Sequence, residues 1–97
     1  MHYCYMASDK STEGLQQIGE RLRLLRVAAG YPNQVEYAEA LSISPQRYNH
    51  WERGRRMPDL WAVGRICTMT GATSDWIYFG VMGAMPPELM RRVRAAS

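Results

Sequence analysis

The stretch QVEYAEALSISPQRYNHWERG, residues 34–54, decides the fold of this chain of 97 residues. Behind Asn33, a good helix-capping residue, apolar side chains recur every three positions and predict a short helix over residues 34–41. Ser44-Pro45 predicts the start of a second helix, because a serine hydroxyl caps free amides and proline fits the first helical position. Only a three-residue break separates the two helices, so they must cross steeply.

The side chains within this stretch meet the packing requirements of a helix-turn-helix unit. Ala38 is small at the position that the second helix crosses. Ile43, Tyr48 and Trp51 are apolar where side chains must point into the core. Ser42 occupies the turn, where glycine is usual because the backbone tends toward positive φ. We therefore expect a turn that is strained but intact.

Four further helices are predicted around this unit. Apolar residues at spacings of three and four predict a long first helix, which Gly30 and Pro32 stop. Asp59 and Thr73 are the predicted caps of two of the others, whose ends fall at breaks with glycine or proline. No segment shows the alternation of a strand. The helices outside the unit are predicted over residues 15–29, 60–70, 74–79 and 88–95. The expected fold class is all-α, a compact five-helix bundle with a short sixth helix at the C-terminus.

Length and composition favour one globular domain. The chain is 46% hydrophobic and 22% charged, with no run of 18 apolar residues and no secretory signal pattern at its start. We expect a cytoplasmic protein with a flexible tail over residues 1–12, a helical domain over 13–80 and a C-terminal extension over 81–97. The cysteines and histidines lack the spacing of a metal site, so we expect no metal.

The positive charge is concentrated in one short segment. Residues 44–56 contain four arginines against Glu52, a net charge of +3 that equals the net charge of the whole chain. A local basic block is typical of a surface that binds a polyanion such as nucleic acid. A solvated charged loop is the alternative that the charge alone leaves open.

Four motifs, in this order, make the chain resemble the XRE/Cro-type helix-turn-helix regulators, the family of lambdoid phage repressors. The motifs are GERLRLLR (19–26), Gln34 with Ala38, WERGRRMP (51–58) and DWIYFG (75–80). The resemblance implies a lambda-repressor-like fold and a bacterial or phage transcriptional regulator, most often a repressor, that binds specific double-stranded DNA. It further implies a homodimer on a palindromic operator.

The resemblance also implies which side chains meet DNA. The second helix of the unit would lie in the major groove, where Gln46 and Asn49 suit adenine and Arg47 suits guanine or a phosphate. Pro45 departs from the family pattern, because its side chain cannot hydrogen-bond to a base. Each arginine could instead be a solvated surface charge. The predicted DNA-binding residues are Gln34, Ser44, Pro45, Gln46, Arg47, Asn49, His50, Arg53, Arg55 and Arg56.

Two more expectations concern an ion pair and a dimer contact. Arg26 and Glu52 match the positions of an internal ion pair in relatives, with two exposed charges as the alternative.

Residues 73–93 carry surplus apolar side chains, part of which must complete the core while the rest favours self-association. A segment that only covers its own protomer is the alternative there. The predicted dimer contacts are Trp76, Tyr78, Phe79, Met82, Met85, Leu89 and Met90.

Three other classes of function compete with this interpretation. An enzyme is not expected, because the chain has no glycine-rich phosphate loop and no nucleophile elbow, and its two histidines lie in unrelated places. A protein-interaction module on the same fold is a second alternative. An acidic second helix in the helix-turn-helix unit would support it, whereas the arginines found here argue against it. An antitoxin that regulates its own operon would add a toxin partner at the C-terminal extension. We expect no cofactor, no small-molecule ligand and no membrane contact.

Overall fold

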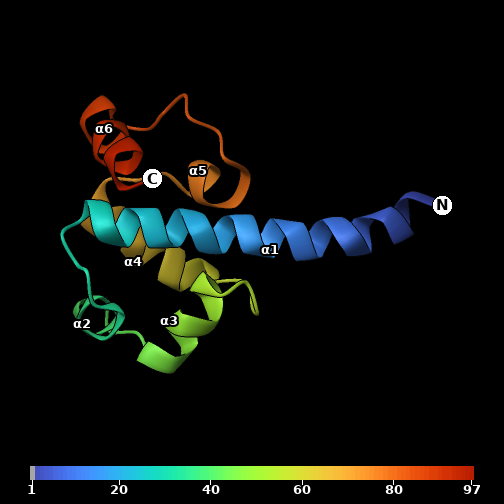
Figure 1. The fold of residues 1–97 in the computed structure, drawn as a ribbon, viewed down its shortest axis with the longest axis horizontal. Coiled ribbons are helices and arrows are strands. Elements are labelled where there is room, and N and C mark those ends of the chain that lie inside the picture. The colour runs from blue at the N-terminus through green and yellow to red at the C-terminus, as the bar shows by residue number, and fades with distance from the viewer. Residues whose placement is uncertain (1) are drawn as a thin grey trace.

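The structure, a computed structural model, describes the backbone of residues 2–97 and the side chains of residues 13–97. Within that range the chain is all-helical, and the predicted fold class is confirmed (Figure 1). α1 runs through the middle, with α2 and α3 on one side and α5 and α6 on the other. The helices are α1 (His2–Ala28), α2 (Gln34–Ala40), α3 (Pro45–Glu52), α4 (Leu60–Thr70), α5 (Ser74–Phe79) and α6 (Pro87–Ala96).

The first helix is longer than its apolar pattern predicts. Residues 2–12, expected as a flexible tail, continue α1, and this part projects beyond the other helices in Figure 1. Apolar residues recur only from Leu15 onward, so the pattern marks just the packed part. A helix that already exists can extend through backbone hydrogen bonds alone. Met1 lies outside the described residues. No helix in the described range, α1 included, is both long and apolar enough to cross a bilayer.

The predicted caps are confirmed, and they fix the helix boundaries. Four side chains accept hydrogen bonds from first-turn amides: Asn33 from Val35 (2.7 Å), Ser44 from Arg47 (3.4 Å), Asp59 from Ala62 (2.9 Å) and Thr73 from Trp76 (3.1 Å). Ser42 has a φ of 58°, the left-handed backbone expected at the turn between α2 and α3. Gly54 ends α3 with a φ of 73°.

One core fills the space around α1. Leu22 and Leu25 of α1 are fully buried beneath side chains from the other helices. α1 and α3 approach so closely at Gly19 that an added Cβ would lie 2.4 Å from the carbonyl oxygen of Glu52. The backbones of the two helices are therefore in direct contact, and this contact fixes the position of α3 against α1.

Aromatic rings fill the core beneath the helix-turn-helix. The ring centroids of Tyr31 and Tyr37 lie 5.2 Å apart, those of Tyr37 and Tyr48 5.4 Å, and those of Tyr48 and Trp51 6.2 Å. The Tyr48 hydroxyl donates to the carbonyl oxygen of Leu22 at 3.3 Å. The Tyr37 hydroxyl is buried and has no hydrogen-bond partner among the described residues. Burial raises the pKa of both tyrosines, so both stay neutral.

Replacing Tyr37 with phenylalanine is expected to raise the free energy of unfolding by about 1 kcal/mol, because it removes a buried hydroxyl that makes no hydrogen bond. Tyr48→Phe is the matched control. It removes a hydroxyl that does make a hydrogen bond, and it should lower the free energy of unfolding by about 1 kcal/mol. Urea denaturation measures both. Equal destabilisation by the two substitutions would contradict the difference between their environments.

Candidate nucleic-acid interface

α3 has one apolar and one polar face. Tyr48 and Trp51 are buried, whereas Gln46 and Arg47 are exposed and Asn49 is half-buried. Residues three and four apart share a face of a helix, which explains the separation. The outer face of α3 therefore presents amides and a guanidinium together, and these groups can read the edges of base pairs.

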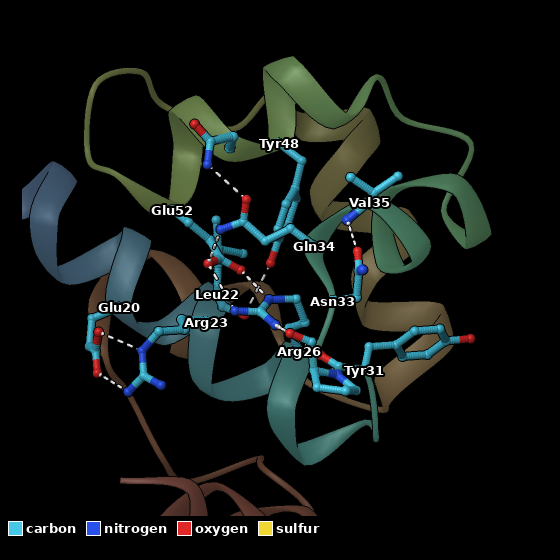
Figure 2. Close-up of polar contacts among 12 residues, drawn as sticks. Glu20, Leu22, Arg23, Arg26, Tyr31, Asn33, Gln34, Val35, Tyr48 and Glu52 are labelled. Atoms are coloured by element: carbon cyan, nitrogen blue, oxygen red, sulfur yellow. Dashed lines mark hydrogen bonds and ion pairs between the residues drawn. The ribbon is translucent and has the colours of Figure 1, made fainter.

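Arg26 and Glu52 form an internal ion pair (Figure 2). Arg26 Nε donates to Glu52 Oε2 at 2.7 Å, and the two side chains are only 9% and 5% exposed. Arg26 Nη1 also donates to the carbonyl oxygens of Tyr31 and Pro32. Burial alone would lower the pKa of Arg26, but the hydrogen bond and charge of Glu52 outweigh it and raise the pKa. The pair ties α1 to α3 and to the loop before α2.

Hydrogen bonds lead from this pair to the outer face of α3. Glu52 Oε1 accepts from Gln34 Nε2 at 2.7 Å, and Gln34 Oε1 accepts from Asn49 Nδ2 at 2.7 Å. In Figure 2, dashed lines join Arg26 to Glu52 and Glu52 to Gln34. A carboxylate can only accept, so Glu52 orients the Gln34 amide, which in turn orients the Asn49 amide. Asn49 keeps its carbonyl oxygen and a second N–H, for which the described residues supply no hydrogen-bond partner.

Gln34 therefore has a role that the sequence did not reveal. It is one of the predicted DNA-binding residues, and both ends of its amide are also engaged within the protein. It is a bridge between Glu52 and Asn49. The available sequence signal was weak: a polar side chain at the start of one helix and another on the outer face of the next.

Arg47 lies beside the start of α4 and does not extend freely from α3. Its Nη2 donates to Asp59 Oδ2 at 2.5 Å, and its guanidinium carbon lies 5.4 Å from the centre of the Trp51 ring. Asp59 Oδ1 meanwhile accepts from the amide of Ala62. The capping role of Asp59 was predictable from the sequence, whereas its pairing with Arg47 was not.

A hollow opens between α3 and the segment that precedes α4. It brings together three of the predicted DNA-binding side chains of α3 and one of the arginines that follow α3. Asp59 is the single acid among the residues that line it. The full lining consists of Gln46, Arg47, His50, Trp51, Arg56, Met57 and Asp59. The predicted interface thus includes a depression lined by two arginines, with an acid at one edge.

The arginines after α3 extend this basic surface. Arg53, Arg55 and Arg56 are all exposed, and the described residues include no acid paired with them. Ser44 is exposed and caps α3, while Pro45 is half-buried at the first helical position. The predicted DNA-binding residues therefore gather on α3, its two ends and the start of α2.

The C-terminal segment mostly completes the core of its own protomer. Tyr78 is half-buried, and its hydroxyl donates to the carbonyl oxygen of Pro58 at 3.0 Å. Only Phe79 and Met82 of the predicted dimer contacts are well exposed, at 75% and 55%, with Val81 between them at 52%. Burial in the protomer removes the other four from the predicted dimer contacts: Trp76, Met85, Leu89 and Met90.

Comparison with known proteins agrees with this geometry. Residues 17–75, more than half of the chain, match the family described as Helix-turn-helix domain. The chain belongs to this family, which confirms the resemblance found in the sequence.

The chain is also similar to the SPbeta prophage-derived uncharacterized HTH-type transcriptional regulator YonR of Bacillus subtilis (strain 168). The two are 34% identical over 62 residues, which cover 64% of this chain and 56% of that protein. The chain thus spans little more than half the length of that relative. No solved structure matches the chain.

Proposed function

We propose that the chain is a DNA-binding transcription regulator that reads a specific duplex sequence with α3 in the major groove. The observation that carries this proposal is the orientation of the Asn49 amide, which Gln34 and the buried Glu52 hold. A side chain fixed in advance loses less conformational freedom on binding. The remaining oxygen and N–H of Asn49 match N6–H and N7 of adenine.

The other side chains of the outer face complete the reading of bases. Gln46 is exposed and makes a second amide contact to an adenine. His50 donates to a guanine acceptor or to the backbone. Pro45 offers only an apolar contact, which suits a thymine methyl group. Arg53, Arg55 and Arg56 follow the phosphates, which position the protein without reading sequence.

The regulator binds as a homodimer through the end of α5 and the turn that follows it. Phe79, Val81 and Met82 form a run of exposed apolar side chains there, which favours contact with a second copy. A two-fold dimer pairs with a palindromic operator, whose half-sites lie one helical turn apart. Occlusion of the polymerase at such an operator, in the cytoplasm of a bacterial cell, makes the regulator a repressor.

Selection from a pool of random duplex DNA at low salt tests this function. We expect enrichment of a palindrome with half-sites about 10 base pairs apart. Asn49→Ala should lower discrimination about tenfold at one position of each half-site, because it removes a bidentate contact to adenine. Sequencing of the enriched pool measures both. Gln17→Ala, which removes an exposed amide from α1, should leave the enriched sequence unchanged.

Two results would overturn the proposal. One is the absence of any duplex retention at low salt, which would favour a protein-interaction module. The other is retention without enrichment of any sequence. The mass of the purified protein in solution separates a homodimer from an antitoxin, which would carry a second, different protein.

A further inference from the structure

Arg47 is held by two groups of its own protomer at the centre of the proposed DNA-reading surface. Asp59 Oδ2 accepts from its Nη2 at 2.5 Å, and the Trp51 ring lies under its guanidinium, 5.4 Å from the central carbon. The neighbouring arginines of the basic surface have no such acid among the described residues. Arg47 is therefore an arginine whose charge is already matched before DNA arrives.

Asp59 cannot follow Arg47 toward DNA. Its other oxygen, Oδ1, accepts from the amide of Ala62 at 2.9 Å and caps α4. Any movement of the pair toward a nucleic acid would break this cap. Arg47 must therefore leave Asp59 to reach an acceptor that lies beyond this fixed carboxylate.

The pair is weak enough to be displaced by the right partner. The Arg47 and Asp59 side chains are 61% and 41% exposed, and ion pairs this exposed contribute little to stability. A single phosphate would give Arg47 the same kind of contact that Asp59 already gives it, with one negatively charged oxygen group. A guanine in register offers two aligned acceptors, O6 and N7.

We infer that Asp59 is a specificity-determining residue, which withholds Arg47 from sequence-independent contact with phosphates. This inference rests on the proposed function. Random DNA gains no net contact by taking Arg47 from Asp59, whereas a guanine at the correct position does. Asp59 thereby lowers binding to random DNA more than binding to the operator.

The test is retention of random-sequence duplex by Asp59→Ser, in which serine keeps the cap of α4. We expect this variant to bind about fivefold more tightly than the wild type at 50 mM salt, because one more arginine can meet a phosphate. The slope of log affinity against log salt should steepen by about 0.9, so the advantage falls about threefold by 200 mM salt. Asp59→Thr, a second neutral cap, should behave in the same way.

Asp75→Ser is the matched control. It removes the same charge from the first turn of α5, which lies across α1 from α3 (Figure 1). It should change retention by less than twofold at 200 mM salt, where a distant exposed charge is largely screened.

A double-mutant cycle then asks whether Asp59 acts through Arg47. Adding Asp59→Ser to an Arg47→Ala protein should change retention no more than Asp75→Ser does. An equal gain with and without Arg47 would overturn the inference, since Asp59 would then act only as a repelling charge. Weaker binding by Asp59→Ser would also overturn it, since Asp59 would then position Arg47 for DNA.

The inference and the proposed function fail in different ways. Duplex binding by the wild type that Asp59→Ser leaves unchanged overturns the inference alone. No duplex binding by the wild type at low salt overturns the proposed function, and the inference with it.

Discussion

Replacing Arg26 with methionine is expected to lower the free energy of unfolding by about 3–5 kcal/mol, because it leaves the buried Glu52 carboxylate without its counter-ion. The substitution also removes the donor to the carbonyl oxygens of Tyr31 and Pro32, which hold the loop before α2. Urea denaturation measures the change. We expect the helix-turn-helix to loosen first, since the pair joins α3 to α1.

Arg23→Met on the same helix is the control for this prediction. Arg23 also pairs with a glutamate, Glu20, at 2.6 Å, but the two side chains are 39% and 56% exposed. Loss of this pair should change the free energy of unfolding by less than about 1 kcal/mol. Equal effects of the two substitutions would mean that burial of the Arg26 pair has no energetic weight.

Replacing Arg53, Arg55 and Arg56 together with alanine is expected to weaken binding to duplex DNA about 100-fold at 50 mM salt, because three phosphate contacts are lost. The slope of log affinity against log salt should fall in magnitude by about 2.7. Titrations at several salt concentrations measure both quantities. The preferred sequence should stay the same, since phosphate contacts carry no base information.

A triple alanine variant of Arg91, Arg92 and Arg94 is the control for the loss of charge. These arginines lie on α6, across α1 from α3, and the substitution removes the same total charge (Figure 1). At 200 mM salt it should leave DNA affinity within about twofold of the wild type, because distant exposed charges are screened. A loss equal to that of the Arg53, Arg55 and Arg56 variant would show that total charge, and not this surface, governs binding.

The sequence predicted those features of the fold that local chemistry determines. Asn33, Ser44, Asp59 and Thr73 each cap the helix expected of them, because a cap needs only a side-chain oxygen and the amides two or three residues later. Ser42 takes the positive φ of the turn for the same local reason. The extension of α1 was not predictable in this way, because residues 2–12 carry no apolar repeat.

Features that depend on contacts between elements were only partly predictable. The bridge from Glu52 through Gln34 to Asn49 joins residues far apart in sequence, and no spacing rule reveals it. The apolar residues after α5 posed a different problem. Composition cannot distinguish a side chain such as Met85, which fills the protomer's own core, from Phe79, which stays exposed.

The contact between α1 and α3 at Gly19 sets the position of α3 independently of the side chains on its outer face. Because backbone rests on backbone there, the angle of α3 does not depend on the size of any side chain at that point. Under the proposed function, new operator preferences arise by exchange of Gln46 and His50 on the outer face, while the core stays unchanged. Asn49 must change together with Gln34, its hydrogen-bond partner. Under that function, a few substitutions would be enough to direct the same scaffold to a different operator.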